Sequence, residues 1–243
     1  MTFNTIIIPD ADSTNTMLKK MACEGAEIGT VLVAKRQSGG KGRLGRAFSS
    51  EEGGLYASII FPYDEGMSAG LLTTFAAVAV SEAIESLAPV RADVKWVNDI
   101  LIEGKKVCGI LAEGAVTGDR RVAILGIGIN LTNKLEGELL PIASNLRELC
   151  GVSISPEQML EALLDKLSHF ETAKLPKIID EYRHRCITLG KEIDVIPHNG
   201  EKYTAFALDI HHDGSLIVKR ASDGEEIRIF SGEVSTRQRE AAQ

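Results

Sequence analysis

"TVLVAKRQSGGKGRLGRAFSSEEGGLYASIIF", residues 30–61, joins two apolar runs through a glycine-rich loop. The β-branched and aliphatic residues of Thr30–Arg36 and Gly54–Phe61 predict a strand on each side of this loop. Dinucleotide-binding turns share the G-x-G-x-x-G spacing found at residues 40–45, but their glycines open a helix whose N-terminus holds the pyrophosphate. Because a strand follows here, the stretch argues against a Rossmann fold and predicts a flexible loop between two strands.

The loop is strongly basic. Five basic residues and no acidic residue occur from Lys35 to Arg46, although the net charge of the whole chain is -7. Glycines allow the backbone to wrap around a ligand, while lysine and arginine side chains bind a phosphate or a carboxylate. The companion motifs of a protein kinase and the G-K-S/T of a P-loop do not accompany it. We therefore expect the loop to become ordered around an anion; a solvated basic loop is the alternative interpretation.

The composition is that of an ordinary globular protein. The 243 residues, 44% hydrophobic and 25% charged, suffice for one large domain or for one large and one small domain. The negative net charge argues against bulk binding of nucleic acid. The cysteines have neither zinc-ligand spacing nor the pattern of a disulfide framework, which favours reduced thiols in a cytosol. They are Cys23, Cys108, Cys150 and Cys186.

Two apolar stretches could be mistaken for membrane or export signals. "GLLTTFAAVAVSEAIESLA", residues 70–88, contains Glu82 and Glu85 at helical spacing, which suits a buried amphipathic helix better than a membrane span. The N-terminal "MTFNTIIIPDADSTN" has no basic region and only three consecutive isoleucines, so it does not resemble a signal peptide. We therefore expect a cytoplasmic protein that does not associate with a membrane.

Strand-like and helix-like patterns alternate in the first part of the chain. Helices are predicted over Ser13–Glu24 and Ser68–Leu87. Residues 94–115 predict strands around a Gly104–Lys105 turn, and "RVAILGIGINL", residues 121–131, predicts a further buried strand. The order of these elements indicates an α+β fold with a mixed sheet rather than a regular βαβ series.

The pattern changes twice in the last part of the chain. Residues 156–186 predict helices, and after Gly190 short alternating strands are separated by Asn-Gly and Asp-Gly turns. The second pattern is typical of a small β-barrel. We place the boundary after residue 187, which gives a large domain over 1–187 and a small one over 188–243.

Several short motifs accompany the basic loop in a specific order. "DSTN" at residues 12–15 precedes it, and "KWVNDILIEGKKVCGIL" at 95–111 and "GIGIN" at 126–130 follow it. With these motifs the chain resembles the biotin protein ligases, in which a G-R-G-R-x-G-R loop wraps biotinyl-adenylate and K-W-P-N-D and K-x-x-G-I-L segments line the site. "SGEVS" at 231–235 resembles the end of that family's small barrel.

The resemblance implies a fold and a reaction. The large domain is expected to be a class II synthetase-like catalytic domain and the small one an SH3-like barrel. Biotin and ATP are the implied substrates, with Mg²⁺, and biotinyl-5′-AMP is the implied intermediate. The implied acceptor is a lysine of a biotin carboxyl carrier domain, as in acetyl-CoA carboxylase.

The resemblance assigns one group of residues to biotin. Hydroxyl and amide side chains suit the ureido ring, which offers both hydrogen-bond donors and an acceptor. A plain helix N-cap is a compatible role for Ser13, and a solvated hairpin lysine is the alternative for Lys106. The implied biotin-binding residues are Ser13, Thr14, Asn15, Gln37, Gly40, Lys41, Gly42, Lys106 and Gly109.

Lys106 and Arg43 are the implied catalytic residues. An ammonium at Lys106 would bring the biotin carboxylate toward the α-phosphate, and Arg43 would neutralise that phosphate. We expect Mg²⁺ to be bound by the ATP phosphates near Asn98 and Asp99, and we assign it no set of protein ligands. The alternative role of these two residues is turn formation. The residues implied for ATP or the adenylate are Lys41, Arg43, Arg46, Phe48, Lys95, Asn98 and Asn130.

The chain departs from the family pattern at four positions. Lys41 replaces an arginine and keeps its charge but not its bidentate fork. Leu44 replaces a basic residue, Phe48 stands where a tryptophan often covers adenine, and Val97 replaces the proline of K-W-P-N-D. Only twelve residues precede "STN", too few for a winged helix-turn-helix, so we expect no binding to DNA. A homodimer is left open.

Two other functions are left open by the sequence. A lipoate or octanoate transferase has a related fold and would need a longer apolar channel. A non-catalytic biotin- or nucleotide-binding module would not need Arg43, Lys106 and Asn98 together, so their joint presence favours an enzyme.

Overall fold

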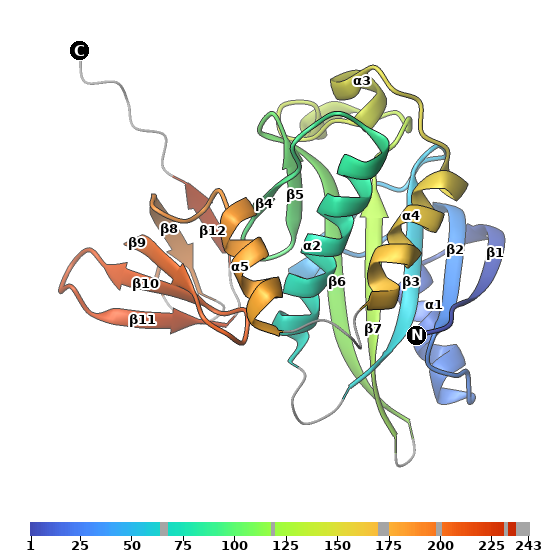
Figure 1. The fold of residues 1–243 in the computed structure, drawn as a ribbon, viewed down its shortest axis with the longest axis horizontal. Coiled ribbons are helices and arrows are strands. Elements are labelled where there is room, and N and C mark those ends of the chain that lie inside the picture. Colours follow the sequence, from blue (N-terminus) through green and yellow to red (C-terminus); the bar gives the residue numbers. More distant parts are fainter. Residues whose placement is uncertain (64–67, 118–119, 170–174, 198–200, 231–232, 237–243) are drawn as a thin grey trace.

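The computed structural model of the chain describes residues 1–63, 68–117, 120–169, 175–197, 201–230 and 233–236. A seven-stranded sheet has the order β1-β2-β3-β7-β6-β5-β4, and a five-stranded sheet has the order β11-β10-β9-β8-β12. Helices cover both faces of the large sheet, and the small sheet lies to one side, next to α5 (Figure 1). The predicted α+β class is confirmed.

The large sheet is mixed, as predicted. β1 and β2 are parallel, whereas the other neighbouring strands are antiparallel. The basic loop connects β2 to β3, two neighbouring antiparallel strands, so it is a strand-to-strand connection as the sequence predicted. The strands are β1 (Asn4–Ala11), β2 (Thr30–Gln37), β3 (Leu55–Pro62), β4 (Asp93–Lys95), β5 (Asp99–Ile102), β6 (Lys105–Thr117) and β7 (Arg120–Ile129).

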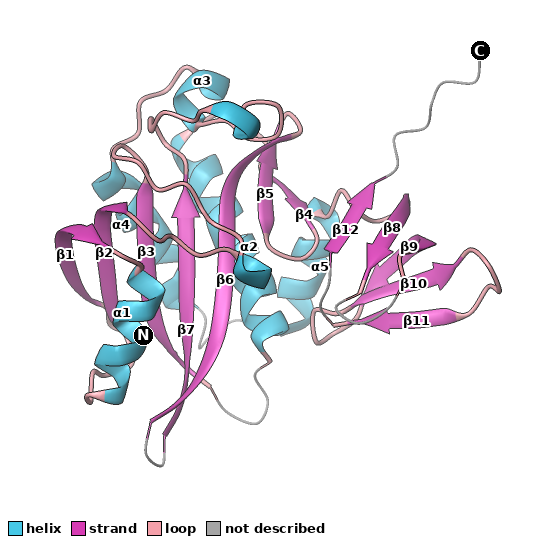
Figure 2. Cartoon of the chain, turned by 180° about the vertical axis from the view of Figure 1, so that it is seen from behind, coloured by secondary structure: helices cyan, strands magenta, loops and turns pink. Residues whose placement is uncertain are grey.

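The helices form two layers around this sheet. α1 (Thr14–Cys23) lies on one face (Figure 2), and α2 (Ala69–Leu87), α4 (Pro156–Ser168) and α5 (Leu175–Arg185) cover the other (Figure 1). Ser13 and Ser68 accept hydrogen bonds from backbone N–H groups of the helices that they precede, which explains why these helices begin where the sequence predicts. The short helix α3 (Leu146–Cys150) was not predicted.

Helix α2 is the centre of the main core. By length and composition alone it could cross a membrane, but 72% of its apolar window is buried inside the protein. It packs against α4, α5 and β6, and its Leu72, Ala76 and Ile84 are fully buried. The prediction of a buried core helix is confirmed, and its burial extends around most of its circumference because helices and sheet surround it.

The hairpin between β5 and β6 differs by one residue from the prediction. Its two central residues are Glu103 (φ 51°) and Gly104 (φ 77°), whereas Lys105 already belongs to β6. Positive φ at both central residues is the requirement of a type I′ turn, whose twist matches that of the flanking strands. The turn is therefore Glu103–Gly104, not Gly104–Lys105.

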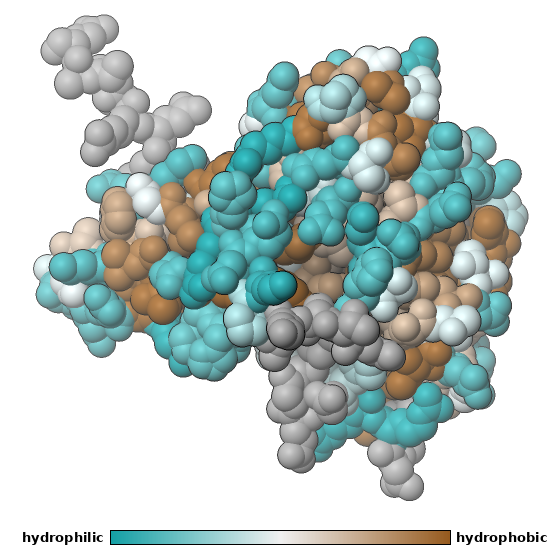
Figure 3. Space-filling view, in the orientation of Figure 1, coloured by the Kyte–Doolittle hydropathy of each residue, from teal (hydrophilic) through white to brown (hydrophobic). Residues whose placement is uncertain are grey.

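The small sheet is antiparallel throughout and corresponds to the predicted SH3-like barrel. Gly214 and Gly224 have positive φ in two of the predicted turns, whereas the Asn199–Gly200 turn and Ser231–Gly232 lie outside the described residues. Apolar surface is visible over this sheet in Figure 3. The predicted domain boundary falls between α5 and β8 and stays a prediction. The strands are β8 (Glu192–Ile196), β9 (Tyr203–Ile210), β10 (Leu216–Arg220), β11 (Glu226–Ile229) and β12 (Glu233–Thr236).

Candidate active site

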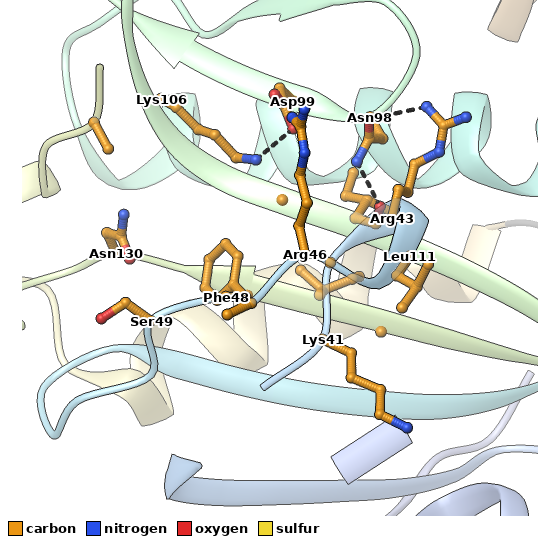
Figure 4. A pocket seen from close by; sticks show the side chains of 18 of the residues that line it. Lys41, Arg43, Arg46, Phe48, Ser49, Asn98, Asp99, Lys106, Leu111 and Asn130 are labelled. Atoms are coloured by element: carbon orange, nitrogen blue, oxygen red, sulfur yellow. Dashed lines mark hydrogen bonds and ion pairs between the residues drawn. The ribbon is translucent and has the colours of Figure 1, made fainter. Parts of the chain in front are cut away.

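A cavity of about 460 Å³ lies on the α1 side of the large sheet, bordered by the basic loop (Figure 4). It is lined by the start of α1, the loop, the turn between β4 and β5, strands β6 and β7, and the segment after β7. The structure brings every predicted site residue to its lining except Gly40. A β-carbon at Gly40 would lie 2.4 Å from the carbonyl oxygen of Phe48 and 2.6 Å from Ser50 Oγ, so this glycine lets the two arms of the loop pack together.

Glycines form the floor of the cavity. Gly126 and Gly128 alternate along β7, and Leu125 and Ile127 point into the main core on the opposite face. A β-carbon at Gly128 would lie 2.5 Å from the Phe48 ring, and one at Gly126 would lie 2.2 Å from Asn15 Oδ1. The Phe48 ring and the Asn15 amide therefore lie directly against the backbone of the sheet, an approach that only glycine permits.

One end of the cavity carries buried hydroxyl and amide groups. Thr14 donates to Gln37 Oε1 from its backbone nitrogen at 2.8 Å and from its hydroxyl at 3.0 Å. Gln37 Nε2 donates in turn to Ser50 Oγ at 2.9 Å. Ser13 is 1% exposed and accepts a hydrogen bond from the backbone of Thr16, so it lines the cavity and caps α1 at once. This end suits a small polar ring that has both donors and acceptors.

Basic side chains gather at another side of the cavity. Lys106 Nζ lies 2.7 Å from Asp99 Oδ1 and 5.9 Å from the centre of the Phe48 ring (Figure 4). Arg43 Nη1 donates to Asn98 Oδ1 at 3.4 Å and so connects the basic loop to the turn after β4. Lys106 is therefore not the solvated hairpin lysine of the alternative interpretation. Lys41, Arg46 and Lys95 also line the cavity.

The basic loop has a defined conformation in the structure. The backbone nitrogen of Gly42 donates to Arg46 at 2.7 Å, and that of Phe48 donates to Gly40 at 2.9 Å. Leu44 has φ 58°, a left-handed conformation that is unfavourable for a bulky residue. The expected ordering of the loop by an anion in solution stays a prediction.

Buried groups hold the turn between β4 and β5 in place. Asn98 Nδ2 donates to the carbonyl oxygen of Ile110 at 2.9 Å, and the Tyr182 hydroxyl donates to that of Val97 at 3.0 Å. Burial raises the pKa of Tyr182 well above its usual value, so this hydroxyl remains a donor. The peptide bond between Trp96 and Val97 is cis. The hydrogen bonds of Asn98 and Tyr182 thus hold the turn so that Asn98 and Asp99 line the cavity.

Asn130 is occupied by structural hydrogen bonds. Its Nδ2 donates to the carbonyl oxygen of Ser144 at 3.2 Å, and its Oδ1 accepts from Asn133 Nδ2 at 3.1 Å. It therefore shapes the segment after β7, a turn-forming role that is common for asparagine. It also lines the cavity, so its predicted contact with adenine stays a prediction.

Several cavity residues were not predicted from the sequence. Gly126 and Gly128 could have been recognised from the sequence, since two glycines on the same face of a strand indicate that another group approaches its backbone closely. Leu139 and Ile142 follow β7 in a segment without a recognisable pattern, and Ile196 comes from the small sheet. Only the tertiary structure brings these three apolar side chains to the cavity.

The residues near Asn98 and Asp99 fit an ion that is bound mainly by substrate phosphates. No group of three or more His, Cys, Asp or Glu residues capable of holding a metal occurs within the described ranges. Asp99 and the Asn98 amide supply oxygen atoms of the kind that Mg²⁺ prefers, and this ion commonly takes one or two protein carboxylates plus phosphates and water.

Comparison with known proteins agrees with this geometry. Residues 8–130 match the biotin/lipoate A/B protein ligase family. The bifunctional ligase/repressor BirA of Bacillus subtilis (strain 168) is 40% identical over 237 residues, which cover 91% of this chain and 70% of that protein. A biotin acetyl-CoA-carboxylase ligase of Mycobacterium tuberculosis is 31% identical, over 94% of this chain and 87% of that protein.

A solved structure extends the comparison to the whole fold. The biotin protein ligase of Aquifex aeolicus, determined in complex with biotin and ATP, superposes with a TM-score of 0.80 at 29% identity. The match covers 97% of this chain and 99% of that one, including the small C-terminal sheet. The chain therefore belongs to the biotin/lipoate A/B protein ligase family and has the fold of a biotin protein ligase.

Proposed function

We propose that the protein activates biotin with ATP and transfers it to a lysine of a biotin carboxyl carrier domain. One observation carries the proposal: a single cavity joins a buried polar end at Thr14 and Gln37 to a cationic side at Lys106 and Arg43. Biotin has the same division, because a ureido ring lies at one end and a carboxylate at the other. The relatives named for biotin ligation support the same substrate.

In the first step a carboxylate oxygen of biotin attacks the α-phosphorus of ATP. The bond from that phosphorus to the bridging oxygen breaks, so pyrophosphate leaves and biotinyl-5′-AMP forms. Lys106 orients the carboxylate, and Arg43 neutralises the charge that develops on the α-phosphate. Lys106 is paired with Asp99 in the structure, so the biotin carboxylate exchanges with Asp99 as its partner.

In the second step the ε-amine of a carrier lysine attacks the acyl carbon. The acyl carbon–oxygen bond breaks, AMP leaves, and the amine loses a proton as the amide forms. Lys106 stabilises the charge on the acyl oxygen during this attack. The basic loop covers the adenylate and limits its reaction with water.

We give the remaining cavity residues the roles that the family resemblance implies. Ser13, Thr14, Gln37 and Gly42 surround the ureido ring, Asn15 lines the same end of the cavity, and Gly109 allows close approach of the ligand. Lys41, Arg46, Lys95 and Asn98 bind phosphate oxygens, while Phe48 and Asn130 lie on the adenine side. Mg²⁺ would be held by the phosphates with Asp99, and it would neutralise phosphate charge.

The test is a pair of assays on the purified protein. Pyrophosphate release is measured with ATP plus biotin, lipoate or octanoate, and biotin transfer is then measured with a purified carrier domain. We expect release with biotin only, and labelling of one carrier lysine. Release with lipoate or octanoate would instead support the related transferase, and biotin binding without any release would support a non-catalytic module.

A further inference from the structure

A row of polar side chains leads from the cavity to Glu113, which does not line it. We call Gln37, Thr14, Ser58, Asn15 and Glu113 the Glu113 row. Its successive contacts are Gln37 Oε1 to Thr14 Oγ1 at 3.0 Å, Thr14 Oγ1 to Ser58 Oγ at 2.8 Å, Ser58 Oγ to Asn15 Oδ1 at 2.6 Å, and Asn15 Nδ2 to Glu113 Oε2 at 3.0 Å. The three middle residues are at most 5% exposed, so water cannot compensate for an unmade hydrogen bond.

The two amides at the ends of the hydroxyl pair have fixed orientations. Gln37 must present its oxygen to Thr14, because the backbone N–H of Thr14 donates to that same atom at 2.8 Å. Asn15 must present its NH₂ group to Glu113, because an ionised carboxylate only accepts hydrogen bonds. Both amides therefore place an oxygen, not a donor, next to the two hydroxyl groups.

The hydroxyl pair is consequently short of one proton. Three oxygen–oxygen contacts join Gln37, Thr14, Ser58 and Asn15, but Thr14 and Ser58 supply only two protons. If the Asn15 amide turned over, its NH₂ group would donate to Ser58 and all three contacts would be satisfied. Glu113 prevents this, because the turned amide would place its oxygen against the carboxylate.

We propose that Glu113 is a positioning residue that makes this end of the cavity require an N–H donor from its ligand. A ligand N–H donated to Gln37 Oε1 replaces the Thr14 hydroxyl as the donor to that oxygen. The Thr14 hydroxyl can then turn to Ser58, so the two shortest contacts, Thr14–Ser58 and Ser58–Asn15, each hold a proton. This inference rests on the proposed function and refines it: a cyclic urea, such as the ureido ring of biotin, has such N–H groups, whereas the dithiolane ring of lipoate has none. Glu113 thus selects the ligand without touching it.

The floor of the cavity supports the same arrangement. A β-carbon at Gly126 would lie 2.2 Å from Asn15 Oδ1 and 3.0 Å from Asn15 Nδ2. The amide therefore lies close against the backbone of the strand, and hydrogen bonds direct its two ends to Ser58 and Glu113. A change at Glu113 is transmitted to the cavity through the Asn15 orientation.

A pair of substitutions that exchanges the amide of Asn15 with the acid of Glu113 tests the proposal. Asn15→Asp places two carboxylates in contact, and we expect it to weaken biotin binding, measured by calorimetry without ATP, by about 30-fold. Glu113→Gln alone should change the affinity by less than about threefold, since its amide oxygen still accepts from Asn15. The double variant should recover to within about fivefold of wild type, because the new glutamine donates to the new aspartate.

Direct contact of Asn15 with the ligand would give a different result. If Asn15 donates to biotin itself, the double variant stays as weak as Asn15→Asp, and the proposal is overturned. Thermal unfolding of each variant checks that the fold is intact. Should Asn15→Asp not fold, the double variant and the variant described next carry the test.

Glu113→Leu removes the carboxylate and allows the Asn15 amide to turn over. We expect biotin affinity to fall about tenfold and KM for ATP to change by less than about twofold. If the wild-type protein binds lipoate measurably, that affinity should not fall. A Glu113→Leu protein that binds biotin like wild type overturns the proposal but leaves the proposed function intact. Failure of the wild-type protein to bind biotin overturns the proposed function, and this inference with it.

Discussion

The indole Nε1 of Trp96 donates a hydrogen bond to the carbonyl oxygen of Gly214 at 3.1 Å. Trp96 belongs to the turn that carries Asn98 and Asp99, whereas Gly214 lies between β9 and β10 of the small sheet. The backbone nitrogen of Trp96 also donates to Thr188 Oγ1 at 3.0 Å. The small sheet therefore supports the wall of the cavity that carries Asn98 and Asp99.

Gly214→Ala should disturb this contact. Gly214 has φ 84°, and a β-carbon there would lie 2.6 Å from Thr74 Oγ1 and 3.0 Å from the carbonyl oxygen of Gly70. We expect a loss of about 3 kcal/mol in the free energy of unfolding and a larger rise in KM for ATP than for biotin. Gly224→Ala is the matched control, since φ is 76° but the nearest atom is 3.5 Å away, and it should cost only about 1 kcal/mol. If urea unfolding gave equal losses of stability for Gly214→Ala and Gly224→Ala, the close packing around Gly214 would not contribute to stability.

At low pH the fold should lose stability because Asp213, next to Gly214, becomes protonated. Burial opposes ionisation of this carboxyl, but hydrogen bonds from Ser215 and His211 and the charge of Arg228 outweigh it and hold the pKa of Asp213 well below its usual range. A lowered pKa stabilises the fold above about pH 3.9, the unfolded value, and this stabilisation is lost as the pH falls further.

The Asp213→Asn variant tests this predicted direction of the pH dependence of stability. It should be less stable than wild type at pH 7, and the difference in unfolding free energy should shrink toward pH 3, approximately one unit below the unfolded pKa. The exposed Asp165→Asn variant serves as the control. A constant difference across this range would show that Asp213 does not titrate with unfolding.

Lys106→Ala should fold normally and lose most adenylate formation. Removal of a charge-assisted contact to the reacting carboxylate costs about 3 kcal/mol, or about a hundredfold in rate. Pyrophosphate release with biotin and ATP measures the loss. Lys35→Ala is the control, because Lys35 is exposed and is not among the cavity residues. Release at the wild-type rate would refute the role proposed for Lys106.

Arg43→Gly should form the adenylate but retain it poorly. Arg43 joins the basic loop to Asn98, so its loss removes a hydrogen bond between the loop and the turn after β4 and also the charge proposed to neutralise the α-phosphate. We expect faster dissociation of biotinyl-5′-AMP and labelling of bystander lysines on added proteins. Arg36→Ala, outside the cavity, should behave like wild type. Equal retention by wild type and Arg43→Gly, or a loop equally protected from protease with and without biotin and ATP, would mean that the loop does not close over the ligand.

Gly128→Ala should displace the Phe48 ring from the cavity floor. The new β-carbon would lie 2.5 Å from that ring, so Phe48 has to move, and we expect the contact proposed for it with the nucleotide to be lost. We expect KM for ATP to rise about tenfold or more, with biotin affinity less affected. Gly114→Ala, where no atom lies within 4 Å of the new β-carbon, should leave both unchanged. Equal KM values for the two variants would show that Phe48 does not bind the nucleotide.

Local sequence determined much of the architecture and the chemical types at the site. Ser13 and Ser68 begin their helices because a serine oxygen satisfies backbone N–H groups that the first turn leaves without helical partners. The basic loop connects two strands because apolar runs flank it directly. These properties depend on residues within a few positions of one another, and a pattern of that length can be read from the chain.

Contacts between distant segments were decided only by the tertiary structure. Glu113 meets Asn15 across 98 positions and Trp96 meets Gly214 across 118, and neither pairing has a local pattern. Leu139, Ile142 and Ile196 reach the cavity for the same reason. The register of the large sheet and the docking of the small one bring these side chains together, because both are set by the packing of the entire core.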